Sequence, residues 1–202
     1  MHDLIRAHPL ATLVTHAGGA LEVNQLPLLI DPEPAPFGTL RGHMARANPL
    51  WRQAHAGFEA LAVFQGPQAY VTPSWYPSKR ETGKVVPTWN YAVVHAYGPL
   101  VIHDDPVWLR NLVSRLTDQQ EASLAQPWSI SDAPADYIEQ MLRAIVGIEI
   151  PVARIEGKWK VSQNRSAADR SGVAAALEAR GDALSQAMAG LVAEGTANKR
   201  QV

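Results

Sequence analysis

The chain has 202 residues, of which 47% are hydrophobic and 18% charged, a composition that suits one well-filled hydrophobic core and not two independent domains. It has no run of about 18 apolar residues to span a bilayer and no signal peptide at its N-terminus, so a cytoplasmic protein without membrane contact is expected. The absence of cysteine excludes thiolate chemistry and disulfides, and the near balance of 18 Lys and Arg against 19 Asp and Glu disfavours nucleic-acid binding through phosphate neutralisation.

The first half of the chain predicts β-strands. The runs over residues 10–15 and 21–30 read as a hairpin around Gly18-Gly19, and residues 37–44 as a third strand. Asn48 and Pro49 predict the start of a short helix that Gly57 ends. Two further strands are expected over residues 60–64 and 69–72, on either side of a turn at 65–67.

The middle of the chain predicts a loop, a long strand and a helix. Prolines and a glycine interrupt residues 73–87, which are therefore expected to form a loop. A strand rich in Val, Tyr and Trp is predicted over 88–103. Asp105 then caps a helix whose apolar residues, from Trp108 to Leu116, repeat at helical spacing.

The last part of the chain predicts two more helical regions. Asp132 is expected to cap a helix that ends before Gly147 and buries Tyr137, Ile138, Met141, Leu142 and Ile145. One strand follows over about 148–161. Ser166 then opens a C-terminal helical segment, with a weaker stripe beyond Gly181 formed by Leu184, Met188, Leu191 and Val192.

Six or seven strands without regular βαβ alternation predict a mainly β fold with helices, an antiparallel barrel with helical decorations. We expect residues 1–165 to form the barrel and residues 166–202 a helical extension of the same domain. No segment reads as a helix-turn-helix.

The stretch from Tyr70 to Tyr97 holds six of the fourteen aromatic residues, mixed with cations, hydroxyls and amides. A planar cofactor with a phosphate needs such a mixture, with flat side chains for the ring and cations for the phosphate. The same pattern also fits a strand whose aromatic side chains fill the core. Composition does not separate these two interpretations.

Two other segments are candidates for phosphate binding. In residues 42–49 a strand leads into a helix N-terminus with Arg46 beside it, where backbone amides favour an anion, although Arg46 also fits a surface cation and His43 a half-buried polar residue. In residues 157–164, alternation places Lys158 and Lys160 on one face and Trp159 on the other. Lysines in that pattern also protect edge strands. The histidines show no close metal-ligand spacing, so no metal site is predicted.

Five ordered segments together resemble the PaiB-like family of FMN-binding negative transcriptional regulators. They are residues 9–14, 42–49, 73–76, 86–91 and 157–164, which include Pro-Ser-Trp-Tyr and Val-Pro-Thr-Trp-Asn-Tyr. The resemblance implies a split β-barrel similar to pyridoxamine-phosphate oxidases, and a homodimer with FMN in the groove between subunits. It also implies a part in repression, through DNA or a regulatory protein partner.

The resemblance also implies which residues contact the cofactor. Val23, Asn24 and Gln25 would line the isoalloxazine, and His43 and Arg46 would approach the phosphate. The motif segments would complete the cleft through Trp75, Lys79, Thr88, Trp89, Asn90 and Lys158. No catalytic residue is assigned.

The sequence departs from the family at two points. Relatives carry a Met-Tyr-x-Pro-x-x-Phe-like segment about a dozen residues upstream of the present start. At Gln25 the family typically has His, so a role that needs imidazole is lost, whereas an amide still donates to a flavin carbonyl.

Two other functions remain open beside the regulator. The same groove suits a small FMN-dependent oxidoreductase, and the same scaffold suits haem or another planar ligand.

Overall fold

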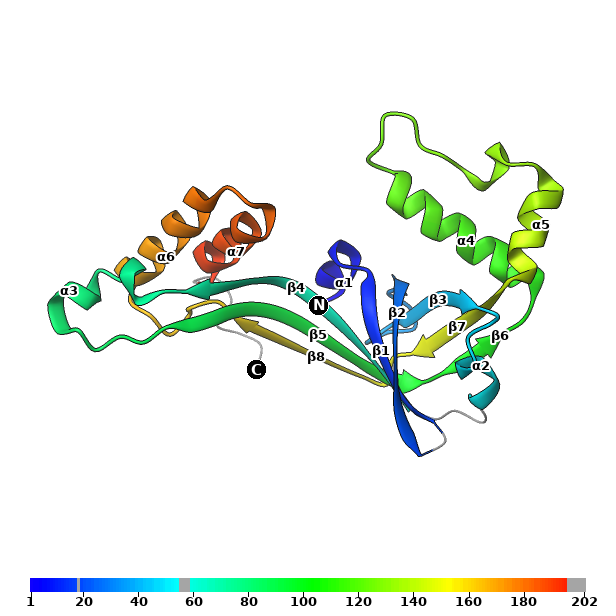
Figure 1. Ribbon diagram of the computed structural model, residues 1–202, viewed down its shortest axis with the longest axis horizontal. Helices are drawn as coiled ribbons and strands as arrows, with labels where there is room; N and C mark the ends of the chain where they lie inside the picture. Colours follow the sequence, from blue (N-terminus) through cyan, green and yellow to red (C-terminus); the bar gives the residue numbers. More distant parts are fainter. Residues whose placement is uncertain (18, 55–58, 196–202) are drawn as a thin grey trace. The chain divides into compact units, whose positions relative to one another are not determined.

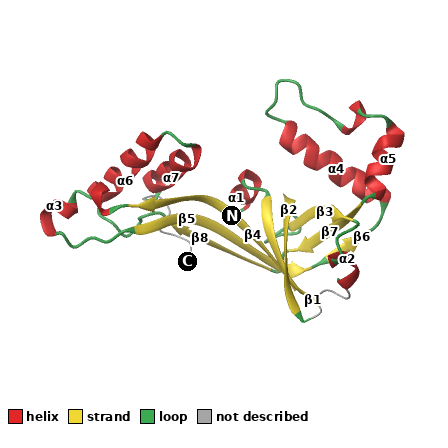
Figure 2. Cartoon of the chain, in the orientation of Figure 1, coloured by secondary structure: helices red, strands yellow, loops and turns green. Residues whose placement is uncertain are grey.

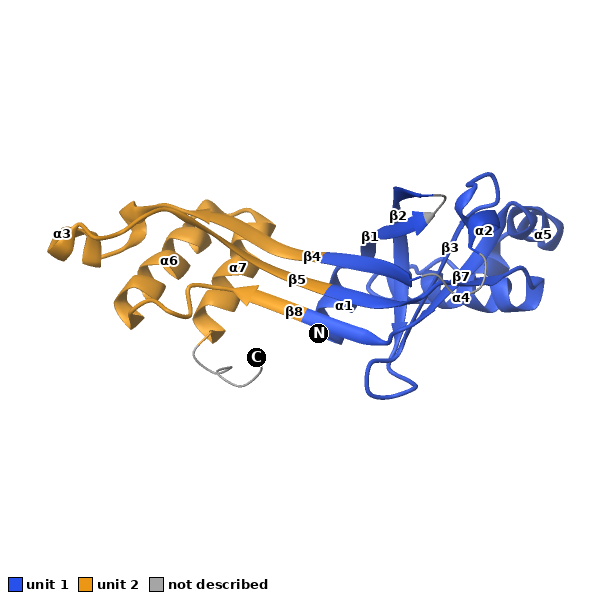
Figure 3. Ribbon diagram, turned by 90° about the horizontal axis from the view of Figure 1, so that it is seen from below, with its two compact units in different colours: residues 1–64, 95–156 blue, residues 65–94, 157–202 orange. Residues whose placement is uncertain are grey.

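The structure is a computed structural model that describes residues 1–17, 19–54 and 59–195. The chain divides into two compact units (Figure 3). Unit 1 comprises residues 1–64 and 95–156, and unit 2 comprises residues 65–94 and 157–202. The predicted division into a barrel over 1–165 and an extension over 166–202 stays a prediction.

The described residues contain eight strands, in the sheet order β6-β7-β3-β2-β1-β4-β5-β8 (Figure 1). The pairs β1–β2, β1–β4, β2–β3, β3–β7 and β6–β7 are antiparallel, as predicted for this fold class. The strands are β1 (Leu10–Ala17), β2 (Ala20–Asp31), β3 (Thr39–Ala45), β4 (Glu59–Val71), β5 (Thr88–Pro99), β6 (Val101–His103), β7 (Ile145–Pro151) and β8 (Arg154–Lys160).

Helices lie between and after these strands (Figure 2). The α-helices are α1 (His2–Ala7), α2 (Leu50–Gln53), α3 (Ser78–Thr82), α4 (Pro106–Glu121), α5 (Ala135–Arg143), α6 (Ala167–Arg180) and α7 (Ala183–Glu194). Two 3-10 helices are η1 (Pro73–Trp75) and η2 (Ile130–Asp132).

In unit 1, alternation along the strands gives the sheet a buried face and an opposite face. On β3, Leu40 and Met44 are buried, and their register partners on β7 are the buried Ile150 and Val146. Burial of such side chains stabilises the fold by about 25 cal/mol for each Å² of apolar surface removed from water. The opposite face carries Arg41 and the other residues of odd number on β2 and β3, since Leu29 pairs with Arg41.

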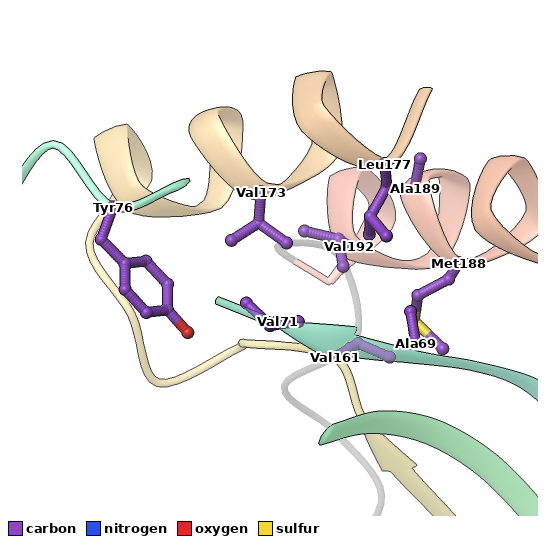
Figure 4. Packing of buried hydrophobic residues seen from close by; sticks show 9 residues of the cluster. All are labelled: Ala69, Val71, Tyr76, Val161, Val173, Leu177, Met188, Ala189 and Val192. Carbon is purple, nitrogen blue, oxygen red and sulfur yellow. The ribbon is translucent and has the colours of Figure 1, made fainter. Parts of the chain in front are cut away.

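Unit 2 has its own hydrophobic core between the sheet and the two C-terminal helices (Figure 4). Ala69 and Val71 of β4 lie against Val173 and Leu177 of α6, and Met188 of α7 closes the same cluster. Ser166 caps α6 by accepting a hydrogen bond from the Asp169 amide at 3.1 Å, as predicted. Gly181 ends the helix with φ of 74°, which separates α6 from α7.

Three strand predictions are wrong in their boundaries. The expected turn at residues 65–67 lies inside β4, which is continuous. Pro67 lies beyond the pairing of β1 with β4, which runs from Ala60 to Val63, so its missing N–H costs no hydrogen bond to β1. The strand expected over 88–103 breaks at Leu100 into β5 and β6, and the one over 148–161 breaks after Pro151 into β7 and β8.

The expected loop over 73–87 contains η1 and α3. Asp169 of α6 explains part of this order, because it accepts hydrogen bonds from the amide and hydroxyl of Ser78 at 3.1 and 2.9 Å. These bonds hold the first residue of α3, which sequence pattern alone did not reveal.

Helix starts are predicted with mixed success. Asp105 caps α4 by accepting from the Trp108 amide at 2.7 Å, as expected. Asp132, however, belongs to η2 and does not cap α5, whose N-cap is Pro134. Helix α2 begins at Leu50 with Pro49 as its N-cap, and its predicted end at Gly57 lies outside the described residues.

The predicted apolar stripes are also only partly buried. On α5, Ile138 and Leu142 are buried, whereas Tyr137 and Met141 are exposed. Ile145 and Gly147 belong to β7 and not to the helix. On α7, Leu184 is exposed, while Met188 and Val192 are buried.

The fold is therefore an antiparallel split β-barrel with helical decorations, as predicted. Within the described ranges, no helix is both long and apolar enough to cross a membrane.

Candidate functional site

Five of the predicted cofactor-binding residues lie in unit 1 and six in unit 2, and each group is described within its own unit. Those in unit 1 are Val23, Asn24, Gln25, His43 and Arg46. Those in unit 2 are Trp75, Lys79, Thr88, Trp89, Asn90 and Lys158.

An open strip of sheet lies on the β1–β2 hairpin of unit 1. We define it by the residues that the register places on one face: Leu10, Thr12 and Val14 of β1, opposite Pro27, Gln25 and Val23 of β2. Leu10 and Val23 are 62% and 60% exposed, although both side chains are apolar. The strip therefore offers apolar surface that this protomer leaves open to solvent.

A polar pair lies in the middle of the open strip. The Gln25 amide nitrogen donates to the Thr12 hydroxyl at 2.9 Å, and that hydroxyl lies 3.1 Å from the Gln25 carbonyl oxygen. The second N–H of the amide and a lone pair of its carbonyl remain for a ligand. The Thr12 hydroxyl therefore restrains the Gln25 side chain, which still has both a donor and an acceptor on offer.

Asn24 lies on the opposite face of β2 from Val23 and Gln25, because side chains alternate along a strand. Its side-chain oxygen accepts a hydrogen bond from Asn48 at 2.6 Å, and the oxygen of Asn48 accepts from the Leu50 amide at 3.0 Å. This chain of amides connects β2 to the start of α2. The three predicted ring-lining residues are therefore divided between the two faces of the strand.

His43 lies at the border of the open strip. Arg41 of β3 pairs with Leu29 of β2, so these two side chains lie on one face of the sheet. Because side chains alternate along a strand, His43 lies on the face of Arg41, and Pro27 and Gln25 lie on the face of Leu29, which is the same face. Its Nδ1 atom is buried and has no hydrogen-bond partner among the described residues. Burial lowers the pKa of this imidazole, so the neutral form is favoured near pH 7.

His43 has a buried nitrogen without a partner, and Gln25 has an amide with free hydrogen-bonding groups. Both lie on one face of the sheet, where they fit a planar heterocycle with polar edge atoms. The apolar side chains of Val23 and Val14 suit the flat surface of such a ring. These residues of unit 1 therefore fit the ring of a flavin. In a flavin site, His43 and Gln25 would address the edge of the ring and Val23 its face.

Arg46 makes contacts within the protein with most of its guanidinium. It donates to the carbonyls of Arg143 and Ile145 at 2.8 and 3.0 Å and to both carboxylate oxygens of Asp104. These bonds leave one Nη1–H. The hydrogen bond from Arg46 is the largest cause that lowers the pKa of Asp104. A phosphate role for Arg46 stays a prediction, and it would have to rely on that one donor.

The predicted residues of unit 2 lie in different surroundings. Trp75 packs against the hydrophobic core of the unit. Asn90 is fully buried, and its amide donates to the hydroxyl of Ser162 at 2.9 Å. Both side chains therefore have structural partners inside unit 2. Trp75 fits the alternative interpretation, in which aromatic side chains of this stretch fill the core.

Of the other four, Lys79, Trp89 and Lys158 are exposed and Thr88 is half-buried. Trp89 is 53% exposed on β5, and Lys158 lies 5.8 Å above the ring of Tyr91. The Lys160 ammonium donates to the Thr88 hydroxyl at 2.7 Å. Lys79 is on α3 and lies 3.4 Å from the Ser74 hydroxyl. Unit 2 thus keeps the aromatic and cationic side chains predicted there, but not in one cluster.

Thr12 is the site residue that sequence reasoning missed. The sequence predicts a hairpin around Gly18-Gly19, and the observed pair of Ala17 with Ala20 gives the register that places Thr12 opposite Gln25. The signal was therefore present in the sequence. In the described part of the chain, no group of three His, Asp or Glu side chains could hold a metal ion.

Comparisons with known proteins identify the family of the chain. Residues 1–154 match the family described as "Putative FMN-binding domain". The chain is 37% identical to an uncharacterized protein of Emericella nidulans, over 96% of this chain and 91% of that protein. It is 32% identical to the protease synthase and sporulation protein PAI 2 of Bacillus subtilis, over 87% of this chain and 82% of that protein.

A solved structure supports the fold. The FAD and haem binding protein of Mycobacterium smegmatis superposes with a TM-score of 0.54 at 15% identity, over 78% of this chain and 68% of that one. At this identity the similarity concerns the fold alone. The family match confirms the resemblance found in the sequence and, at the level of the family, FMN as the cofactor. The chain belongs to the PaiB-like family of FMN-binding split-barrel proteins.

Proposed function

We propose that this protein is an FMN-binding negative transcriptional regulator that acts as a homodimer, with the flavin between the open strips of two protomers. The observation that carries the proposal is the open strip itself, where Gln25 and Val23 share a face with the unpartnered nitrogen of His43. The similarity to the sporulation protein of Bacillus subtilis supports the regulatory part.

A dimer follows from the apolar surface of the strip. Leu10, Leu21 and Val23 lie on one face of the hairpin and are each at least 60% exposed. Pairing two such faces would remove this apolar area from water, and obligate dimers bury on the order of 2,000 Å² or more in total. A planar ring held between them would have apolar contacts on both sides.

When bound, FMN supplies reversible electron transfer. The residues of this chain orient and tune it. Gln25, held by Thr12, would donate to a ring carbonyl, and the neutral imidazole of His43 would offer a hydrogen bond to a ring edge atom. The redox state of the ring would then change the hydrogen bonds that the strip makes, and so bias the dimer.

Flavin binding is tested by titrating the purified protein with FMN and following quenching of flavin fluorescence. Gln25→Ala should weaken affinity about ten-fold, because it removes a hydrogen bond to the ring worth roughly 1.5 kcal/mol. Gln120→Ala, on an exposed position of α4 in the same unit, is the matched control and should bind as the parent does. Equal affinities for all three proteins would place the ring elsewhere.

The neutral imidazole beside the strip also favours a second function, a small FMN-dependent oxidoreductase, since a neutral His43 can accept a proton that accompanies flavin chemistry. Anaerobic addition of NADH or NADPH to the FMN-loaded protein separates the two. Rapid bleaching followed by turnover with an acceptor indicates the enzyme. Slow bleaching without turnover indicates the regulator.

A further inference from the structure

Two exposed aromatic rings meet on the sheet of unit 2. Tyr70 of β4 and Trp89 of β5 are 43% and 53% exposed, and their ring centroids lie 5.9 Å apart at an interplanar angle of 68°. Ala69 and Val71, on either side of Tyr70, point to the helices α6 and α7 (Figure 4). Tyr70 and Trp89 therefore occupy the face of the sheet opposite to these helices.

Lysines lie beside these rings. Tyr91 shares the face of Trp89 two residues further along β5, and the Lys158 ammonium lies 5.8 Å from the centroid of its ring. Trp159 packs against the hydrophobic core, so the alternation predicted from the sequence is confirmed. Lys158 and Lys160 leave the strand on the other side, and the Lys160 ammonium donates to the Thr88 hydroxyl at 2.7 Å. We call Tyr70, Trp89, Tyr91, Lys158 and Lys160 the aromatic–lysine face.

The near-neutral charge of the whole chain conceals an uneven distribution. The described part of unit 2, up to residue 195, holds eight Lys and Arg residues against five Asp and Glu, whereas unit 1 holds eight against fourteen. Unit 2 therefore has the basic excess that phosphate binding needs, although the whole chain does not. Two of these cations, Lys79 and Arg80, lie on the helix α3 at the end of the β4–β5 pair (Figure 1).

We propose that the aromatic–lysine face binds single-stranded nucleic acid. Exposed aromatic rings stack with bases of any identity, and adjacent lysines neutralise the phosphates between them. Duplex bases are already stacked and cannot reach Trp89 or Tyr70 in this way. Edge protection by lysines explains Lys158 and Lys160, but it gives no reason for two exposed aromatic rings beside them. The inference deepens the proposed regulatory function, on which its biological meaning rests.

The first test uses fluorescence anisotropy of labelled oligonucleotides of about 15 nucleotides, a length within the range covered by single-strand binding proteins. The full chain should bind single-stranded DNA or RNA more tightly than the corresponding duplex. Comparing the affinities for the DNA strand and the RNA strand shows which nucleic acid the face prefers. Trp89→Ala should weaken binding about ten-fold, the loss of one base stack. Trp128→Ala, which removes a 44% exposed tryptophan from unit 1, should leave it unchanged.

The second test addresses the phosphates. The double variant Lys158→Ala/Lys160→Ala should lower affinity and reduce the slope of log K against log salt by about 1.4, since each phosphate neutralised on a single strand contributes about 0.7. The control is Arg110→Ala/Arg143→Ala in unit 1, for which the slope should not change. An unchanged slope in the lysine variant contradicts the proposal.

Three further outcomes overturn the proposal. The first is the absence of oligonucleotide binding, and the second is displacement of the oligonucleotide by free FMN, which would make this face part of the flavin site. The third is dissociation of a dimer by Trp89→Ala in sedimentation velocity, which would make it an interface with a second copy of the chain. Flavin binding by the parent protein is measured separately by its absorbance. Failure of the proposed function is therefore distinguishable from failure of this inference.

Discussion

The amide of Gln25 donates to the hydroxyl of Thr12 at 2.9 Å across the β1–β2 hairpin, between two residues that the register places directly opposite each other. The pair is exposed, so its value to folding is small, roughly 0.5 to 1 kcal/mol. Its value to ligand binding is larger, because it restrains the side chain of Gln25 before a ligand arrives. A flexible amide would lose rotamer freedom on binding, whereas this one is already ordered.

Thr12→Val is therefore expected to weaken FMN binding about three- to ten-fold while the free energy of unfolding changes by less than about 1 kcal/mol. Valine keeps the branched shape and the strand preference but cannot hold Gln25. Flavin fluorescence titration and urea denaturation measure the two quantities. If the Thr12→Val and Gln25→Ala effects add in the double variant, the two residues act independently and the positioning role of Thr12 is refuted.

Arg46→Ala should mainly lower stability. The guanidinium connects the end of β3 to Asp104 and to the carbonyls of Arg143 and Ile145. Its removal leaves those acceptors without their donor and should cost roughly 2 kcal/mol in urea denaturation. Asp104→Ala combined with Arg46→Ala should cost less than the sum of the single changes.

Titration with FMN and with riboflavin decides whether Arg46 also holds the phosphate. With most of its donors engaged in the protein, Arg46→Ala should change both affinities by the same factor. A loss of affinity for FMN alone, with riboflavin binding intact, would instead assign the phosphate to Arg46 as the sequence predicted.

The strand pattern of unit 1 was largely predictable from sequence, because alternation and turn residues are local signals. The hairpin of β1 and β2, the start of α4 at Asp105 and the start of α6 at Ser166 follow from such signals and are confirmed. The errors lie where distant residues decide. β4 continues through Pro67, beyond the last residue that pairs with β1, and α3 begins where Asp169 of α6 binds Ser78.

The candidate site was predictable in kind more than in position. The resemblance named Gln25 and His43, and the register places them on one face. It also named Asn24 and Asn90, whose side chains the structure gives to Asn48 and Ser162. Single-sequence reasoning cannot distinguish an amide that waits for a ligand from one that already has a partner, since partners such as Ser162 lie 72 residues away.

Gly172→Ala should destabilise unit 2. In α6, a Cβ at this position would overlap the carbonyl oxygen of Trp75 and approach Pro77 at 3.2 Å. Helix α6 would have to move away from η1, at a cost of roughly 1 to 3 kcal/mol. The matched control is Gly190→Ala in α7, where a Cβ has nothing within 4 Å. The control should be neutral or stabilising by up to about 1 kcal/mol, since alanine favours a helix. Circular dichroism follows the thermal unfolding of both variants. Equal changes in Tm for Gly172→Ala and Gly190→Ala would refute the packing argument.

Asp169 should make the stability of unit 2 depend on pH in the acidic range. Burial by itself raises the pKa of this carboxyl, but hydrogen bonds from the amide and hydroxyl of Ser78 outweigh it and lower the pKa below its ordinary value. A group whose pKa is lower in the folded state binds more protons when unfolded, so its contribution is present above the unfolded pKa of about 3.9 and is lost as pH falls through the folded value. Urea denaturation between about pH 6 and pH 3 should therefore show a smaller loss of stability for Asp169→Asn than for the parent. Asp3→Asn, at an exposed carboxyl of α1, serves as the control and should follow the parent curve. If Asp169→Asn also follows the parent curve, the carboxyl is not what couples α6 to α3 in this range.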